Sequence, residues 1–283
     1  MRPPLHRLRR RAPLAGAVLA AVAATALSLG AGGAAAAPTW APAATATIHP
    51  GVQTFTAGAQ CTANFVYTDG TDVYLGQAAH CSGTGGNTAT DGCTSGSLPV
   101  GTQVTVTGAS KPGVMVYNSW VTMQRLGETD ASTCAYNDLA LIRIDPADVG
   151  KVNPSIPFFG GPTGINTAGT AVGDKVYSYG NSELRGGITQ LSPKRGASLG
   201  DAAGGWTHTV YTVTPGIPGD SGSAFVDANG KALGILSTVA VAPLAGSNGV
   251  GDVAEELAYL HAHTSITAQL VNGTEPFNGS RLS

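Results

Sequence analysis

The chain has 283 residues, with 17 Asp and Glu against 15 Lys and Arg, 40 glycines and a formal net charge of −2. This balance argues against a protein that binds nucleic acid or an anionic membrane through a basic surface. The length allows one large or two small β domains with real cores.

The first 37 residues have the pattern of a signal peptide. Five arginines lie within residues 2–11, an apolar run follows over residues 14–29, and small residues at 34–37 offer a cleavage site. The alternative is an uncleaved membrane anchor, and the choice between the general and the twin-Arg export route stays open. Cleavage would leave about 246 residues with a net charge near −7. The sequence therefore predicts a secreted protein that binds no membrane after cleavage and no nucleic acid.

Short β-prone runs, separated by Gly, Asn, Asp and Pro, fill most of the remaining chain, and this pattern favours an all-β barrel or sandwich. Residues 38–50 have no such pattern and are expected to be an extended arm or a short pro-segment. A Pro- and Gly-rich connection at 145–173 predicts two β halves, 51–155 and 156–283. The expected strands are 63–67, 72–75, 102–107, 139–144, 175–179, 207–213 and 233–237.

One helix is expected near the end of the chain. Val253, Leu257 and Leu260 form an apolar stripe at helical spacing, which would pack on the β core. Asp252 is a candidate N-cap, and Glu255 follows three residues later, as in a capping box.

The four cysteines, Cys61, Cys81, Cys93 and Cys134, predict two disulfides in an exported chain. From the residues alone, three pairings are possible. Their spacings match no zinc site, and we expect no metal and no cofactor.

The segment Thr214–Ser223, with the sequence TPGIPGDSGS, is the first candidate for chemistry. Glycines on both sides of Ser221 allow a sharp turn that exposes a hydroxyl beside free backbone N–H groups, as acyl transfer requires. An ordinary surface turn is the alternative.

A serine hydroxyl needs a base, and His80 is the best candidate among six histidines. Small alanines precede it and Cys81 follows it. Asp138 comes directly before an apolar strand, where a buried carboxylate can orient an imidazole. A structural histidine and a solvated Asn-Asp turn are the alternatives for these two residues.

The order His80, Asp138, Ser221 is that of the chymotrypsin-like enzymes. Residues Ala78–Cys81 (AAHC), Asn137–Ile142 (NDLALI) and Gly219–Gly222 (GDSG) resemble the three catalytic boxes of the chymotrypsin-like serine peptidases, in their secreted bacterial form. The resemblance runs from about Cys61 to the C-terminal helix. It implies two six-stranded antiparallel β-barrels with the catalytic triad between them, and the disulfides Cys61–Cys81 and Cys93–Cys134.

The resemblance also implies roles. Ser221 would be the nucleophile and His80 the general base, oriented by Asp138. The N–H groups of Gly219 and Ser221 would form the oxyanion hole. Ser237 would hydrogen-bond the triad aspartate and begin the substrate-binding strand. A secreted serine endopeptidase acting on protein or peptide substrates, as a monomer, is the expected function. A catalytically silent relative that binds or adheres, or an esterase, is the alternative.

Two departures from the family affect the expected details. The family's activating N-terminus is absent, so Asp220 should pair with an internal arginine, for which Arg125, Arg143, Arg185 and Arg195 are candidates. Pro215 stands at the base of the expected pocket, where an acid would favour Lys or Arg substrates. Small or medium apolar residues are therefore the expected preference. The expected substrate-binding residues are Pro215, Gly216, Ser237, Thr238, Val239 and Gly249.

Overall fold

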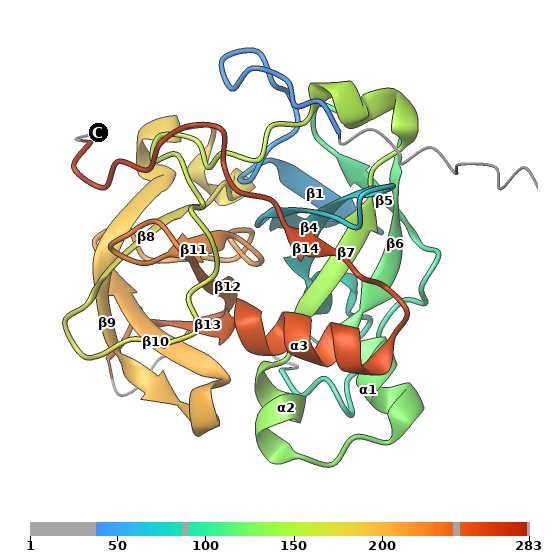
Figure 1. The fold of residues 1–283 in the computed structure, drawn as a ribbon. Helices are drawn as coiled ribbons and strands as arrows, with labels where there is room; N and C mark the ends of the chain where they lie inside the picture. Colours follow the sequence, from blue (N-terminus) through green and yellow to red (C-terminus); the bar gives the residue numbers. More distant parts are fainter. Residues whose placement is uncertain (1–37, 87–89, 240–243, 282–283) are drawn as a thin grey trace, which may run out of the picture. The chain divides into compact units, whose positions relative to one another are not determined.

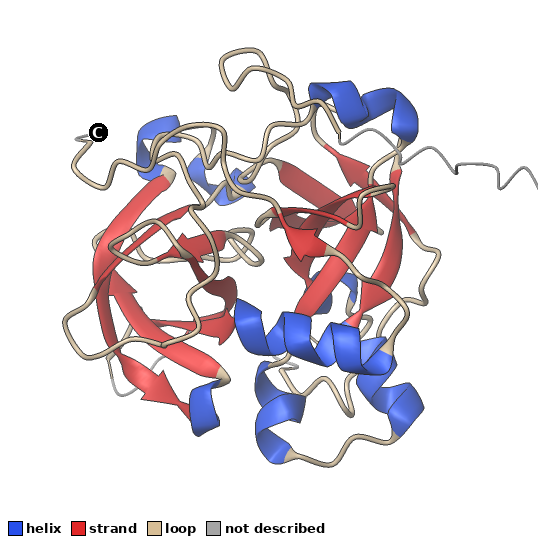
Figure 2. Ribbon diagram, viewed as in Figure 1, coloured by secondary structure: helices blue, strands red, loops and turns tan. Residues whose placement is uncertain are grey.

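The structure is a computed structural model that describes residues 38–86, 90–239 and 244–281. The expected signal peptide, residues 1–37, lies outside the described residues. Within them, every helix is too short or too polar to cross a membrane. Strands dominate, and helices are few (Figure 2).

In the described residues, eight antiparallel strands form a first sheet in the order β14-β3-β4-β7-β6-β5-β1-β2 (Figure 1). Residues 63–65 join β2 to β3 and remain bonded to β4, because Asn64 N donates to Gly76 O (2.8 Å) and Gly76 N donates to Phe65 O (3.0 Å). The strands are β1 (Gln53–Thr56), β2 (Ala59–Thr62), β3 (Val66–Thr68), β4 (Val73–Ala78), β5 (Gln103–Val106), β6 (Gly113–Asn118), β7 (Leu139–Arg143) and β14 (Gln269–Leu270).

The second half contains a closed antiparallel barrel of six described strands, in the order β10-β13-β12-β11-β8-β9. A six-stranded barrel is thus confirmed here. The first sheet has more than the expected six strands, because residues 59–68 are divided between β2 and β3 and because β14 adds to its edge. The barrel strands are β8 (Lys175–Tyr179), β9 (Pro193–Ala202), β10 (Thr207–Thr212), β11 (Ala224–Val226), β12 (Ala232–Val239) and β13 (Asn248–Asp252).

Side-chain patterns explain why these segments are strands. In β5, Val104 and Val106 are buried while Gln103 and Thr105 are exposed, the alternation expected of a sheet with one face in the core. By contrast, β4 is buried along its whole length, and so is β7 up to its last residue. These two strands pair with each other inside the sheet, and both lead to the candidate site.

The expected C-terminal helix is present as α3 (Val253–His263). Its stripe of Val253, Leu257 and Leu260 is buried, and Asp252 Oδ1 accepts a hydrogen bond from Glu255 N at 2.9 Å. Two further helices, α1 (Ser119–Leu126) and α2 (Ala131–Tyr136), were not expected from the sequence.

The end of the chain connects the two halves. Strand β14 pairs with β3, and further along Asn278 N donates to Phe159 O at 2.7 Å. One hydrophobic cluster combines residues of both halves, among them Leu139 of β7 and Leu257 of α3. The helix and the tail therefore fix the frame on which the candidate site is built.

Candidate active site

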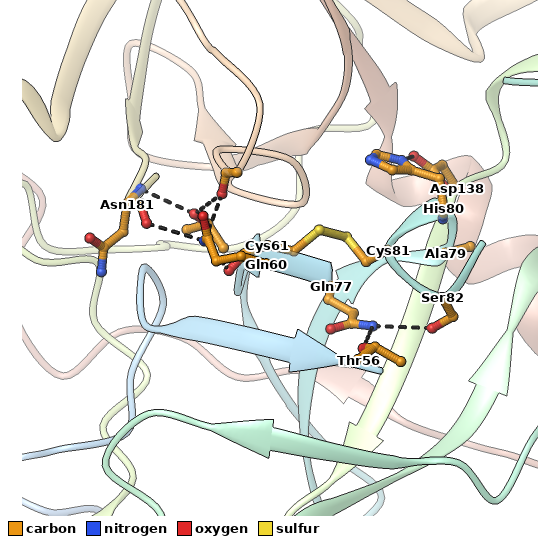
Figure 3. Close-up of a disulfide and its surroundings, with 12 residues drawn as sticks. Thr56, Gln60, Cys61, Gln77, Ala79, His80, Cys81, Ser82, Asp138 and Asn181 are labelled. Carbon is orange, nitrogen blue, oxygen red and sulfur yellow. Dashed lines mark hydrogen bonds and ion pairs between the residues drawn. A yellow bond between two sulfur atoms is a disulfide. The ribbon is translucent and has the colours of Figure 1, made fainter. Parts of the chain in front are cut away.

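His80 and Asp138 are brought together by the pairing of β4 with β7. Ala78, the last residue of β4, lies opposite Leu139, the first residue of β7, so His80 just after β4 meets Asp138 just before β7. His80 Nδ1 lies 2.7 Å from Asp138 Oδ2, and His80 N donates to Asp138 Oδ1 at 2.9 Å (Figure 3). The carboxylate therefore fixes both the ring and the main chain of the histidine.

Burial and charge act in opposite directions on the imidazole. Asp138 is 5% exposed, and about a quarter (24%) of the His80 side chain is accessible. Burial alone lowers the pKa of His80, but the charge of Asp138 and its hydrogen bond raise it more, so the pKa lies above its usual value. With Nδ1 engaged by Asp138, Nε2 is the nitrogen available to a substrate or a nucleophile.

The disulfide Cys61–Cys81 joins β2 to the turn that carries His80 (Figure 3). The second disulfide joins Cys93 to Cys134, so both implied pairings are confirmed. The sulfurs of Cys61 and Cys81 lie near a nitrogen of His80, a grouping that could resemble a metal site. Because both sulfurs are oxidised, they cannot bind a metal as thiolates.

The loop with Ser221 is held against the elements that carry His80. Thr62 N donates to Ser221 O at 2.9 Å, and Gly222 N donates to Leu236 O at 2.7 Å. Gly222 has a φ of +86°, and a Cβ there would lie 2.8 Å from the backbone nitrogen of Ala78. Only glycine allows this approach, which brings the Ser221 loop against Ala78, two residues before His80 in the chain.

No hydrogen bond joins His80 Nε2 to Ser221 Oγ within the described chain. In enzymes without substrate, such contacts are often longer than in the reacting complex. Ser221 itself is half-buried, with its main chain fixed by Thr62.

Two N–H groups of the loop have no acceptor among the described residues, and these are the N–H groups of Gly219 and Ser221. They are the two that the sequence predicts for an oxyanion hole. The other N–H groups between residues 217 and 223 all donate: Ile217 to Asp220 Oδ2, Asp220 to Ile217 O, Gly222 to Leu236 O and Ser223 to Asp220 O.

Gly219 is required by the shape of the loop. It has a φ of +92°, and a Cβ there would lie 2.2 Å from Gln60 Oε1. Its carbonyl accepts hydrogen bonds from Thr62 Oγ1 (2.8 Å) and Gln60 Nε2 (3.1 Å). These bonds fix the orientation of the peptide group between Gly219 and Asp220.

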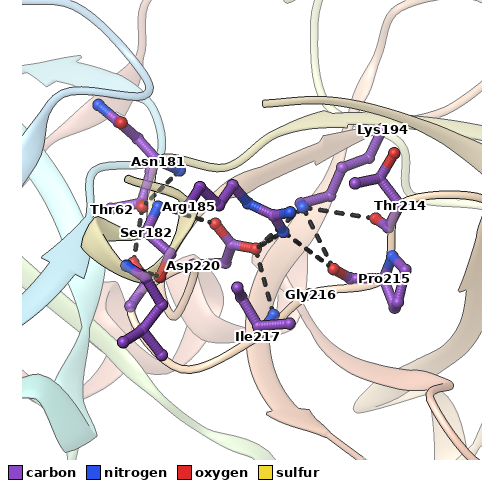
Figure 4. Close-up of polar contacts among 12 residues, drawn as sticks. Thr62, Asn181, Ser182, Arg185, Lys194, Thr214, Pro215, Gly216, Ile217 and Asp220 are labelled. Carbon is purple, nitrogen blue, oxygen red and sulfur yellow. Dashed lines mark hydrogen bonds and ion pairs between the residues drawn. The ribbon is translucent and has the colours of Figure 1, made fainter. Parts of the chain in front are cut away.

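Asp220 is buried and pairs with two cations (Figure 4). Arg185 Nη2 lies 2.5 Å and Lys194 Nζ 2.9 Å from Asp220 Oδ2. Ser182 N donates to the other carboxylate oxygen at 3.1 Å. Arg185 thus supplies the internal cation that the sequence left open among four arginines. The other candidates lie elsewhere: Arg125 near His263 O, Arg143 near Asp72, and Arg195 over Phe158 and Phe159.

Lys194 was missed by the sequence analysis, because a lysine between Pro193 and Arg195 looks like a solvated residue. It is fully buried in β9. Burial lowers the pKa of Lys194, and the repulsion from Arg185 adds to this, while the attraction of Asp220 only partly compensates. The Asp220 carboxylate therefore holds the Ser221 loop against both β9 and the short helical turn Glu183–Arg185.

The expected pocket residues come together around an asparagine that the sequence analysis also missed. Thr238 of β12 pairs with Gly249 of β13. Between them and the Ser221 loop, the buried Asn248 accepts from Gly216 N (2.8 Å) and donates to Thr238 O (3.3 Å). Pro215 O accepts from Arg185 (3.0 Å), and Val239 is 49% exposed at the other end.

One expected contact is absent. Ser237 Oγ is buried, and no described residue hydrogen-bonds to it, so the implied bond from Ser237 to Asp138 was a wrong prediction. The register between β12 and β13 shifts at this point, between Leu236 and Thr238. Both oxygens of Asp138 instead accept from His80.

Comparison with solved structures identifies the fold. Protease A of Thermobifida fusca matches 80% of this chain and 99% of its own, with 17% sequence identity and a TM-score of 0.51. The Nocardiopsis protease NAPase (18% identity, 79% and 98% covered) and a glutamic acid-specific serine protease (22% identity, 76% and 98% covered) both have a TM-score of 0.49. No family model matches the chain, and no curated protein does. The chain thus has the fold of the chymotrypsin-like serine proteases, which was predicted from its three boxes.

Proposed function

We propose that the protein is a secreted serine endopeptidase that uses Ser221, His80 and Asp138. The observation that carries the proposal is the pair of unbonded N–H groups at Gly219 and Ser221, in a loop held beside the His80–Asp138 pair. The other N–H groups of this loop all have acceptors in the protein, so these two are the ones left for an external acceptor. An acyl-transfer site needs both of them.

The reaction follows from these positions. Ser221 Oγ attacks the peptide carbonyl while His80 Nε2 accepts its proton, and Asp138 stabilises the resulting imidazolium. The N–H groups of Gly219 and Ser221 stabilise the oxyanion, each by about 3 kcal/mol in the barrier. His80 then gives the proton to the leaving amine, which departs from the acyl-enzyme. A water molecule, deprotonated by His80, hydrolyses the ester and restores Ser221.

A fluorophosphonate probe tests this assignment. We expect the purified protein to be labelled and to cleave peptides, and the Ser221→Ala variant to lose both, with kcat falling by about a million-fold. Ser223→Ala is the matched control, because Ser223 lies two residues away in the same loop and its Oγ is buried without a partner among the described residues. Labelling that survives in Ser221→Ala would refute the proposal, and absent labelling of the unmodified protein would favour the catalytically silent relative.

We also propose a preference for small or medium apolar residues at P1, the residue before the cleaved bond. Pro215, Gly216, Thr238, Val239 and Gly249 carry no charge, and the guanidinium of Arg185 near Pro215 already binds Asp220. A peptide library varied at P1 measures this preference. Strongest cleavage after Lys, Arg or Glu would contradict it.

The remaining expectations belong to the same proposal. Two disulfides favour an oxidising compartment, in line with secretion. The first sheet without β14 is proposed to be the counterpart of the first barrel, within 51–155, and the closed barrel with α3 to be the second half, within 156–283. Ser221 would act from this half on a bond positioned beside His80.

A further inference from the structure

Glu256 of α3 reaches the main chain of the triad aspartate. Its side chain is fully buried, and its Oε1 accepts a hydrogen bond from Asp138 N at 2.9 Å. Asp138 is therefore held at its backbone by Glu256 and at its carboxylate by His80. The three residues of the proposed triad do not include this glutamate, and the sequence analysis assigns it no role.

The molecule makes room for this contact. A Cβ on Gly251 would lie 2.7 Å from Glu256 Oε1 and 3.0 Å from Tyr136 O, so only glycine leaves space for the carboxyl group there. Glu256 is thus fitted to its position from two sides. Its partner Asp138 directly follows the C-cap of α2, and Gly251 belongs to β13.

Among the described residues, no cation forms an ion pair with Glu256, and its Oε2 has no hydrogen-bond partner, while His208 is bound to Asp252. The groups that influence it electrostatically, or that it influences, are the carboxylates of Asp138 and Asp252 and the phenols of Tyr67 and Tyr117. An ionised carboxylate without a cation is costly to bury. A protonated acid fits this environment.

The direction in which the pKa of Glu256 is shifted agrees with a protonated acid. Burial raises the pKa of Glu256 most, the hydrogen bond from Asp138 N lowers it, and the charges of Asp138 and Asp252 raise it further. The result lies well above the usual value for a glutamate. Burial without a bonded cation thus favours the neutral form of the side chain, which accepts the Asp138 hydrogen bond without adding a negative charge.

We propose that Glu256, in its protonated form, is a positioning residue that holds the main chain of Asp138 and thereby the orientation of the His80 ring. The proposal rests on the proposed peptidase function. A displacement of about 1 Å in a catalytic group can reduce the rate about a hundredfold. A second negative charge beside Asp138 would raise the pKa of His80 further and keep the base protonated at neutral pH. A neutral acid avoids this while it fixes Asp138.

Two substitutions separate the hydrogen bond from the volume. Glu256→Gln keeps a neutral acceptor of the same shape, whereas Glu256→Met keeps the approximate volume and removes the acceptor. We expect Glu256→Gln to retain kcat within about threefold, and Glu256→Met to lose about ten- to a hundredfold in kcat with KM within about twofold. Glu255→Met is the matched control, since Glu255 is the exposed neighbour on the same helix, and it should leave both constants unchanged.

The pH profile of kcat/KM tests the protonation state independently of folding losses in Glu256→Met. If Glu256 is already neutral, Glu256→Gln leaves the acid limb, set by His80, at the same pH. If Glu256 were ionised, its removal would lower the pKa of His80 and move that limb toward acid by about one pH unit. Such a shift would overturn the proposal, and so would an unchanged kcat in a folded Glu256→Met enzyme.

Failure of this inference can be distinguished from failure of the proposed function. The probe labelling of Ser221 in the unmodified protein reports on the function alone. A labelled, active enzyme whose Glu256 variants behave like Glu255→Met would remove only the positioning role.

Discussion

Among the described residues, the partly exposed His80 and the fully buried His208 both bind carboxylates, and they differ in the number of carboxylates that they bind. His80 has one carboxylate partner, Asp138, on Nδ1. His208, in β10, lies between two: its Nδ1 is 2.6 Å from Asp201 and its Nε2 is 2.9 Å from Asp252. His208 is fully buried, and Asp252 also caps α3.

This difference separates a site for chemistry from a structural cation. An imidazole whose two nitrogens both face carboxylates needs a proton on each, so His208 is an imidazolium that links β9, β10 and the start of α3. It has no nitrogen left to accept a proton. His80 has a free Nε2 and one carboxylate that fixes its orientation, which is the arrangement that a general base requires.

The largest expected effect comes from the single carboxylate of His80. Asp138→Asn places an amide opposite Nδ1 and favours the wrong tautomer of the ring, so we expect kcat to fall about ten-thousandfold, equivalent to about 5.5 kcal/mol. The thermal midpoint should change little, because the shape is kept. Steady-state kinetics and thermal unfolding measure both, and a fall of less than tenfold would contradict the assigned role of Asp138.

The opposite pattern is expected at the other histidine. His208→Leu leaves two carboxylates without their cation, one of them buried, and should reduce the free energy of unfolding by about 3 kcal/mol. Since His208 does not touch His80, kcat should remain within about threefold. Urea unfolding in a Ser221→Ala background, which prevents self-digestion, measures the stability. A stable variant with collapsed kcat would reverse the comparison.

The smallest expected effect is a pH dependence. Burial lowers the pKa of His208, but its hydrogen bonds to Asp252 and Asp201 and their charges raise it more, so it lies above the usual value of about 6.5. The stabilisation is therefore complete below about pH 6.5 and is lost as the pH rises through the pKa of the folded state.

The difference in unfolding free energy between the Ser221→Ala protein and its His208→Leu derivative should accordingly shrink as the pH rises from about 5.5 to about 9. Urea titrations of both proteins at the two pH values provide the measurement. A difference that grows with pH would show that His208 is neutral in the folded protein.

The sequence predicted the parts of the site that lie in local motifs. His80, Asp138 and the Gly219–Gly222 turn each lie in a short motif that can be recognised in the sequence. The apolar stripe with its N-cap predicted α3. The fold followed from these motifs and from the spacing of short β-prone runs. Asp220's partner was narrowed to four arginines, because the need for a cation was visible while its location was not.

The missed residues depend on contacts between distant segments. Glu256 stands beside Glu255 in the first turn of a helix, where two acids look like solvated caps, and only the fold buries one of them behind Asp138. Lys194 lies in β9, a long strand that was not expected because Pro193 and two glycines interrupt its pattern. Asn248 and His208 likewise acquire partners only when β10, β12 and β13 pair.

The return of the chain end to the first sheet also determines when the site can be completed. Glu256 lies in the last helix, and β14 pairs Gln269 with Thr68, about two hundred residues earlier. Such distant pairings form late, after the intervening chain has been ordered. During synthesis, His80 and Asp138 therefore emerge before α3 and β14, and their bracing is complete only after these later segments have packed on the first sheet.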